Sequence, residues 1–260
     1  MTYQIIVSTM NQHDDSLIEK MNINSDAIII NQSDHFSYHE TLKNGFVIKW
    51  YEFAERGVGL SRNSGLMRAD ADIIQFADDD MVLTDTYRDD VLCEYEKRPE
   101  ADVILFSNTC LNKDKMPYKV SEFGRVGRIE GVRFGGARIT ARREKLLYNN
   151  ITFSLLFGGG ARYCAGEDVT FVQDCIKSGL GVYKSPIIMS VMKQDSSTWF
   201  KGYDEKYFHD KGALLAANFP LLSKPGAFLQ AYKGMKRSEF TYKKLVELYL
   251  AGAREFLKKR

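Results

Sequence analysis

Three adjacent acidic residues dominate the chemistry that this sequence could perform. Asp78, Asp79 and Asp80 directly follow residues 72–77 (DIIQFA), a short apolar segment that is typical of a buried strand. Neighbouring carboxylates repel one another, and a divalent cation relieves that repulsion. Oxygen ligands suit Mg²⁺ or Mn²⁺, and such a cation would in turn bind a diphosphate. A solvated acidic turn that begins the next helix is the simpler alternative.

A second acidic pair, Glu167 and Asp168, follows the first cluster by about 90 residues. It lies at the start of a segment with helical periodicity, over residues 167–177, after a glycine-rich stretch at 157–161 (FGGGA). A helix N-terminus favours the ionised carboxylate. From residue types alone, the pair could simply cap that helix. Arg62 adds a guanidinium, which can form charge-assisted hydrogen bonds with phosphate.

The elements that would position these residues alternate between two types. Apolar, β-branched segments predict strands at 4–9, 26–31, 46–53, 72–77, 102–106 and 181–188. Helical periodicity predicts helices at 16–21, 62–69, 86–98, 140–148 and 167–177, with Ser61 as the N-cap of the second. Residues 108–138 predict antiparallel strands or long loops. This alternation predicts an α/β fold with a mostly parallel sheet flanked by helices, whose ligands bind at the carboxyl ends of the strands.

Composition narrows the class of protein. The chain has 260 residues, of which 44% are hydrophobic and 27% charged, as in ordinary globular domains. A net charge of +2 gives no overall field for nucleic acid. Residues 224–260, however, hold ten Lys or Arg and three Glu, and they look helical and amphipathic. These helices could contact an anionic membrane surface, pack on the domain as a solvated face, or form a homodimer.

Cysteine usage and the opening residues point to a cytoplasmic protein. The four cysteines form no CxxC pair, and no signal-peptide pattern precedes the first apolar segment. No apolar run approaches the roughly 20 residues that span a bilayer. We therefore expect reduced thiols and a cytoplasmic location, with peripheral contact at the inner face of the cell membrane as the further expectation.

Four short motifs, in the right order, resemble family 2 of the glycosyltransferases, which have the GT-A (Rossmann-like) fold. Residues 8–11 (STMN) resemble the family's first nucleotide-binding turn, although Met10 replaces its usual aromatic residue. Residues 59–66 (GLSRNSGL) resemble its arginine segment, 76–81 (FADDDM) its aspartate motif and 166–168 (GED) its Glu-Asp motif. The resemblance covers roughly residues 3–188. Each motif is weak, but four in sequence are specific.

The resemblance implies an inverting glycosyltransferase that uses a nucleotide-sugar donor and Mn²⁺ or Mg²⁺. It implies that Asp80 is the main metal ligand, that Asp78 and Asp79 contact the nucleotide or the metal's water shell, and that Asp168 is the general base. By the same match, Arg62 approaches the diphosphate and Ser8 and Thr9 line the donor site. Asn31 replaces an aspartate that often reads uracil. His209 is a weaker candidate for an extra metal ligand, with a surface or partly packed histidine as the alternative.

The resemblance also implies a division of the chain. Residues 1–222 would form the catalytic domain, in which 1–107 bind the nucleotide-sugar and 108–222 bind the acceptor and carry a lid. Residues 223–260 would form a basic helical extension. The loop 157–161 would admit the acceptor or be a plain flexible loop, and 193–198 would form the lid. Trp199 and Phe200 would stack on a sugar, close over the donor or join the core. Arg142 and Arg143 would meet acceptor phosphate or form a solvated helix face.

Residues 194–203 resemble a segment of small bacterial members that build surface polysaccharides. Together with the family resemblance, it implies a UDP-sugar donor and a glycan or lipid-linked glycan acceptor, in capsular or exopolysaccharide biosynthesis. Two other functions remain open: a sugar-phosphate nucleotidyltransferase and a non-catalytic carbohydrate-binding relative. The first normally has a glycine-rich phosphate loop near its N-terminus, and residues 8–15 contain no glycine. The second would have no need for both Asp80 and Asp168. A phosphatase with a nucleophilic aspartate pair would carry that pair after its first strand.

Overall fold

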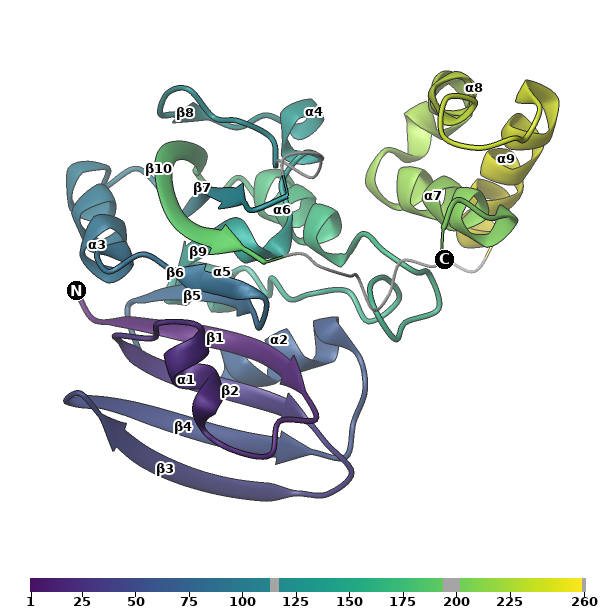
Figure 1. Cartoon of the computed structure of the whole chain (residues 1–260). Coiled ribbons are helices and arrows are strands. Elements are labelled where there is room, and N and C mark those ends of the chain that lie inside the picture. Colours follow the sequence, from purple (N-terminus) through teal and green to yellow (C-terminus); the bar gives the residue numbers. More distant parts are fainter. Residues whose placement is uncertain (113–116, 194–201, 259–260) are drawn as a thin grey trace.

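The computed structural model describes residues 1–112, 117–193 and 202–258, which form a ten-stranded sheet with helices on both faces and a separate helical lobe (Figure 1). The strands are β1 (Tyr3–Met10), β2 (Asp26–Gln32), β3 (Ser37–Lys43), β4 (Phe46–Phe53), β5 (Ile73–Asp78), β6 (Met81–Leu83), β7 (Val103–Cys110), β8 (Gly124–Arg125), β9 (Ile139–Arg142) and β10 (Val182–Met192). The helices are α1 (Ser16–Lys20), α2 (Val58–Arg68), α3 (Tyr87–Lys97), α4 (Arg128–Gly131), α5 (Arg143–Tyr148), α6 (Glu167–Lys177), α7 (Glu205–Asn218), α8 (Ser223–Gly234) and α9 (Tyr242–Lys258), with 3₁₀ turns η2 (Gly136–Arg138) and η3 (Pro220–Leu222).

The strand order places several strand ends at one edge of the sheet. The order is β3-β4-β2-β1-β5-β9-β7-β10-β6, and β8 pairs with β10. β1 runs parallel to both β2 and β5, β2 runs parallel to β4, and β7 runs parallel to β10. β9 lies antiparallel between β5 and β7. The predicted α/β architecture with a mostly parallel sheet is confirmed, and the carboxyl ends of β1, β2, β4 and β5 meet at the same edge.

Alternating side chains on the central strands build two cores. In β1, Ile5 and Val7 face the side that α1 and α3 cover, where they share one apolar cluster with Tyr87. Ile6 points to the opposite side and packs with Phe171 in the cluster that α2, α5 and α6 cover. All five of these side chains are fully buried. A strand buried on both faces therefore reads as a continuous apolar run, which is why its position was evident from sequence.

Two predicted helices differ from the structure. The helix predicted at 140–148 is wrong over its first residues, because Thr140 lies in β9 and its hydroxyl donates to the buried carbonyl of Ile104. Pairing with β5 and β7 outweighs the local helical pattern there. The helix predicted to begin after Ser61 starts one turn earlier, at Val58, with Gly57 as its N-cap. Ser61 is thus buried inside α2, and β3 and β6 are additional strands.

The helical lobe has its own core. Six buried side chains from α7, α8 and α9 form it: Phe208, Ala227, Ala231, Leu245, Leu248 and Tyr249. The lobe therefore includes α7, which precedes the boundary at residue 223 that the sequence suggested. Leu214 of α7 joins the lobe to the body by packing against Phe157 and Tyr163. The division of the body into donor and acceptor halves stays a prediction. Within the described ranges, no helix is both long enough and apolar enough to cross a membrane.

Candidate active site

A buried arginine connects the two acidic motifs. Arg62 lies in the middle of α2, and its Nη2 donates to Asp78 Oδ1 over 2.7 Å. Its Nη1 donates to Asp168 Oδ1 over 2.5 Å and to Glu167 Oε1 over 3.2 Å. Burial alone would lower the pKa of Arg62, but the three carboxylates raise it above its ordinary value. The guanidinium therefore stays charged and ties the end of β5 to the start of α6.

Close packing holds this arginine in place. The ring centroid of Phe153 lies 5.1 Å from Arg62 Cζ. On another side lies Gly136, where an added Cβ would come within 2.5 Å of Asp168 Oδ1 and 2.7 Å of Arg62 Cζ. Only glycine fits beside the ion pair without displacing it. Because both terminal nitrogens of Arg62 already serve carboxylates, a phosphate would have to compete with them for this side chain.

Asp168 and Glu167 differ in how open they are. Both begin α6, after Gly166, whose φ of +119° lies in the left-handed region. Glu167 is the more enclosed, and burial, followed by the charge of Asp168, raises its pKa. The side chain of Asp168 is 22% exposed, and its Oδ2 accepts no hydrogen bond from any residue that the structure describes. Asp168 therefore presents a carboxylate oxygen that could accept a proton, and its role as the general base stays a prediction.

The acidic turn after β5 contains an unpaired buried oxygen. Asp79 Oδ2 accepts the hydroxyl of Thr9 over 2.6 Å. Asp80, by contrast, has a buried Oδ1 with no partner among the described residues. Burial, followed by the charges of Asp78 and Asp79, raises the pKa of Asp80 to about 6. A buried acceptor without a donor calls for an explanation, and a bound cation is one that suits a carboxylate.

The residues at this turn fit a cation that a diphosphate helps to hold. Within the described ranges, no group of three or more His, Cys, Asp or Glu side chains is arranged to bind a metal by itself. Mg²⁺, however, is usually held by one or two carboxylates together with substrate phosphates and water. Asp80 and Asp78 supply such a pair. Both ring nitrogens of His209 instead approach carboxylates of the helical lobe, Asp210 at 3.2 Å and Glu255 at 3.4 Å.

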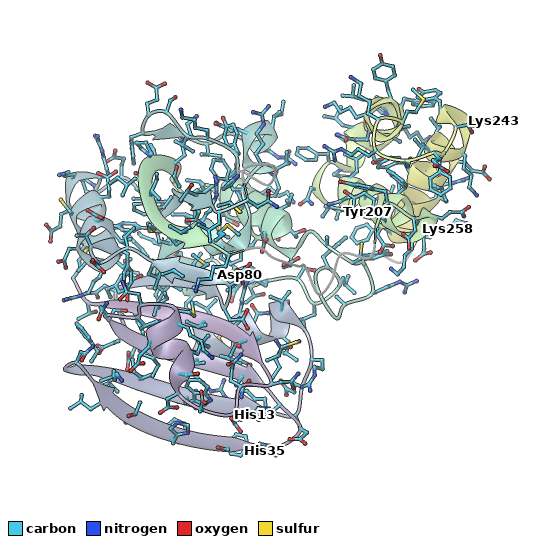
Figure 2. All side chains as sticks on the ribbon, in the orientation of Figure 1. His13, His35, Asp80, Tyr207, Lys243 and Lys258 are labelled. Atoms are coloured by element: carbon cyan, nitrogen blue, oxygen red, sulfur yellow. The ribbon has the colours of Figure 1, made fainter. Side chains whose placement is uncertain are left out.

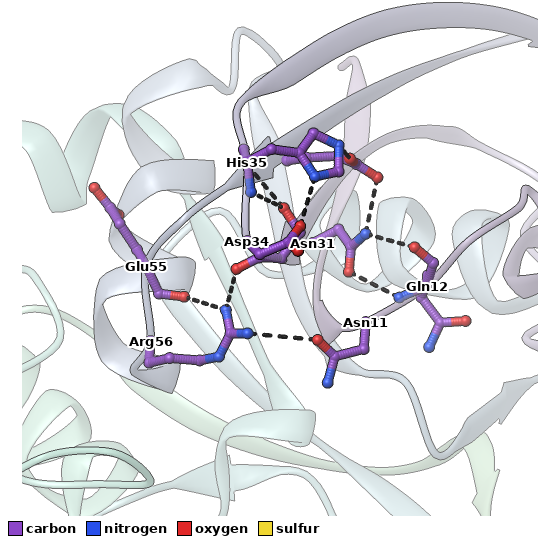
Figure 3. A network of polar contacts seen from close by, with 9 residues as sticks. Asn11, Gln12, Asn31, Asp34, His35, Glu55 and Arg56 are labelled. Atoms are coloured by element: carbon purple, nitrogen blue, oxygen red, sulfur yellow. Dashed lines mark hydrogen bonds and ion pairs between the residues drawn. The ribbon is translucent and has the colours of Figure 1, made fainter.

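The side chain of Asn31 forms hydrogen bonds with the turn that follows β1 (Figure 3). Its side chain is fully buried at the end of β2, and its Nδ2 donates to Gln12 O over 2.9 Å and to Glu52 Oε1 over 3.0 Å. Its Oδ1 accepts the Gln12 N–H over 3.1 Å. Since both amide hydrogens are already donated, Asn31 fixes the turn after β1, and reading a base would cost it one of these bonds. Ser8 is likewise buried, and its Oγ accepts the Ser61 hydroxyl.

Arg56 is a further basic residue at the same edge, beyond those that the sequence motifs indicate (Figure 3). It follows β4, and its Nη1 donates to Ser33 O over 2.5 Å and to Glu55 O over 2.9 Å. Its Nη2 reaches Asn11 Oδ1 at 3.5 Å. These partners are neutral oxygens, so Arg56 keeps a charge that an anionic ligand could use. Its position directly after an apolar strand was the signal that could have identified it.

The predicted acceptor residues have mixed outcomes. The loop 157–161 is irregular as expected but held firmly, because Phe157 stacks on Tyr163 at 5.0 Å and the Gly158 N–H donates to Tyr163 O. Arg142 lies in β9, not on a helix face, and its guanidinium donates to the carbonyls of Ala101 and Tyr95. Apart from Lys193, the predicted lid lies outside the described residues, as do Trp199 and Phe200. Figure 2 labels Asp80 in the body and Tyr207 in the lobe.

Comparison with known proteins identifies the fold. No protein-family model and no curated protein matches the sequence. Among solved structures, S. aureus TarS 1-349 in complex with UDP-GlcNAc is similar, with a TM-score of 0.65 at 12% identity over 100% of this chain and 93% of that one. The mannosyltransferase PcManGT from Pyrobaculum calidifontis, in complex with GDP-Man and Mn²⁺, has a TM-score of 0.54 at 12% identity over 98% and 87%. The chain therefore has the GT-A fold.

Proposed function

We propose that this GT-A protein is a glycosyltransferase that moves a sugar from a nucleotide-sugar donor to a hydroxyl of a glycan acceptor, with inversion. One observation carries the proposal: Arg62 joins Asp78, at the end of β5, to Asp168, at the start of α6. The two acidic motifs, which are far apart in sequence, thus form one site at a sheet edge where α/β proteins bind ligands. TarS with UDP-GlcNAc and PcManGT with GDP-Man support the class of donor.

In the proposed reaction, Asp168 acts as the general base. Its open Oδ2 accepts the proton of the acceptor hydroxyl as the oxygen attacks the anomeric carbon. The bond from that carbon to the donor diphosphate breaks, and the nucleoside diphosphate leaves with the electron pair. One base and no enzyme nucleophile suffice for this single displacement. Arg62 orients Asp168 through its hydrogen bond to Oδ1.

Asp80 and Asp78 would hold Mn²⁺ or Mg²⁺ in this proposal. A bound divalent cation supplies Lewis-acid stabilisation of the charge that develops on the departing diphosphate. The unpartnered buried Oδ1 of Asp80 supports the assignment, as does the Mn²⁺ in PcManGT. Asp79, anchored by Thr9, keeps the turn in position. Arg56 is a basic residue at this edge whose hydrogen-bond partners among the described residues are neutral oxygens, so it could bind an anion.

The finer features of the proposal are a UDP-sugar donor and a role in bacterial surface-polysaccharide synthesis at the inner face of the membrane. Support for UDP comes from the TarS complexes, one with UDP-GlcNAc and one with UDP. PcManGT with GDP-Man shows that the same fold also accepts guanine nucleotides in another protein. Because Asn31 is committed to Gln12 and Glu52, base preference must come from other contacts.

Donor hydrolysis tests the proposal directly. A panel of UDP- and GDP-sugars is incubated with the protein, with Mn²⁺ or with a chelator, and release of nucleoside diphosphate is measured. We expect release from at least one donor, only with the metal. The Asp168→Asn variant should lose about 10²-fold or more of the transfer rate while it keeps nucleotide affinity. Asp174→Asn, on the same helix and part of an outward ion pair with Lys177, is the matched control. Full activity in Asp168→Asn would show that Asp168 is not the base.

A further inference from the structure

A groove of about 640 Å³ separates the helical lobe from the body. On one side it is lined by Ile129 and Val132 near α4 and by Val169 of α6; on the other it is lined by residues of α7, α8 and α9. Figure 1 shows α4 and α6 facing the lobe. The volume is in the range of pockets that enclose a ligand. Val169 directly follows Asp168, so the groove extends to the turn of α6 that carries the proposed base.

Much of the groove is apolar and unusually exposed. Ile129 is 82% exposed, Leu222 59% and Leu229 55%, although all three line the same hollow. Aliphatic side chains that line a hollow but stay in water lose the free energy that burial would give them. Grouped exposed residues of this kind, unlike scattered ones, mark a binding surface. The apolar part of the groove therefore fits a hydrocarbon chain.

The same groove carries positive charge without negative charge. Lys211, Lys233 and Arg237 line it, and no Asp or Glu does so among the residues that the structure describes. Lys211 lies over Tyr207, with its Nζ 5.5 Å from the ring centroid, and no described carboxylate forms an ion pair with it. Burial lowers the pKa of Lys211, against the opposing effects of Cys164, Glu167 and Asp168. A largely desolvated ammonium that forms no close ion pair is costly, and a bound phosphate would offset that cost.

We propose that this groove binds the acceptor, and that the acceptor is a glycan joined through a phosphate to an apolar chain. The chain lies along Leu222 and Leu229, the phosphate meets Lys211 and Lys233, and the sugar reaches Asp168. A free polar glycan would leave the leucines without a partner, and a neutral lipid would leave the cations without one. This inference rests on the proposed function and names the class of its acceptor.

Calorimetry with decyl phosphate below its micelle concentration tests the groove. We expect decyl phosphate to bind to the wild type. Inorganic phosphate, which lacks the apolar chain, and decyl maltoside, which lacks the phosphate, should each bind at least tenfold more weakly. Leu229→Glu and Lys233→Glu should each weaken decyl phosphate binding about tenfold or more. Their controls are Leu221→Glu and Lys236→Glu, since both residues are exposed on the same lobe but do not line the groove.

Donor hydrolysis without acceptor is measured in the same five proteins, and it separates the two proposals. Hydrolysis should be equal in all of them, because none of these residues lies at the donor site. If groove and control variants bind decyl phosphate equally, or if inorganic phosphate binds as well as decyl phosphate does, the acceptor assignment is wrong even when hydrolysis is intact. If decyl phosphate binds as expected but no donor is hydrolysed, the proposed glycosyltransferase activity is wrong and the groove remains an amphiphile site.

Discussion

The guanidinium of Arg62 donates to Asp168 Oδ1 over 2.5 Å, across a sequence separation of 106 residues. The same guanidinium also donates to Asp78, so one buried cation is shared by the carboxylate proposed as base and one proposed to hold metal. The side chain of Arg62 is only 3% exposed. The arrangement makes Arg62 a positioning residue for both, and its neutralisation by three carboxylates distinguishes it from a phosphate-binding arginine.

Replacing Arg62 should destabilise the protein. Arg62→Met leaves Asp78, Glu167 and Asp168 without their shared cation, and breaking a buried ion pair in this way costs about 3 kcal/mol or more. The free energy of unfolding is measured by denaturant titration. The control is Arg68→Met, at the exposed end of the same helix, where we expect a loss of less than about 1 kcal/mol. Equal losses in the two variants would contradict the assignment.

Removing Asp80 should separate metal binding from folding. Asp80→Asn should weaken nucleotide binding in Mn²⁺ about tenfold or more, which corresponds to about 1.4 kcal/mol, and change it little in chelator. Without metal, the same variant should be more stable than the wild type above pH 6, because burial makes the ionised Asp80 unfavourable in the folded state. Asp89→Asn, whose side chain is 80% exposed on α3, is the control for both measurements. A metal-independent loss of affinity would argue against the metal role.

Adding one methyl group at Gly136 should disturb the ion pair. In Gly136→Ala the new Cβ would lie 2.5 Å from Asp168 Oδ1, so the pair must move, at a cost of about 1–3 kcal/mol in stability and with a lower transfer rate. Gly127→Ala has nothing within 4 Å of its new Cβ and serves as the control. Melting temperature and kcat are measured together. The idea fails if Gly136→Ala behaves like the control in both.

The contact between lobe and body should depend on pH through Asp210. Burial would raise the pKa of Asp210, but hydrogen bonds from Lys206, the Cys164 N–H and His209 lower it below the ordinary value. The carboxylate therefore contributes stability that is fully present above about pH 4, the unfolded pKa, and is lost as the pH falls through the lower folded pKa. Asp210→Asn should cost about 1.5–3 kcal/mol at pH 7, as expected for hydrogen bonds to a charged group.

The cost of Asp210→Asn should be clearly smaller at pH 3 than at pH 7, as measured by denaturant titration at both values. The control is Asp174→Asn. Asp174 forms a solvent-exposed ion pair with Lys177, so this variant should change stability little at either pH. A cost for Asp210→Asn that stays constant from pH 7 to pH 3 would show that its charge does not hold the lobe in place.

Local patterns predicted the framework of this protein. The buried strand before Asp78 was evident because a strand covered on both faces is a continuous apolar run, and the helix after Gly166 was evident from its periodicity and stop signal. β9 was taken for a helix because its residues only become a strand through pairing with β5 and β7. α7 was not recognised, since its buried face is completed by residues of α8 and α9.

The sequence by itself therefore determined which residues could do chemistry and at which strand or helix ends they lie. Only the tertiary structure decided that Arg62 serves Asp168 and Asp78, that Asn31 is already committed to Gln12, and that Lys211 faces an apolar groove. The physical reason is the range of the interactions. Strand and helix patterns arise between residues a few positions apart, whereas a buried charge takes its partner from whatever the fold brings within about 3 Å.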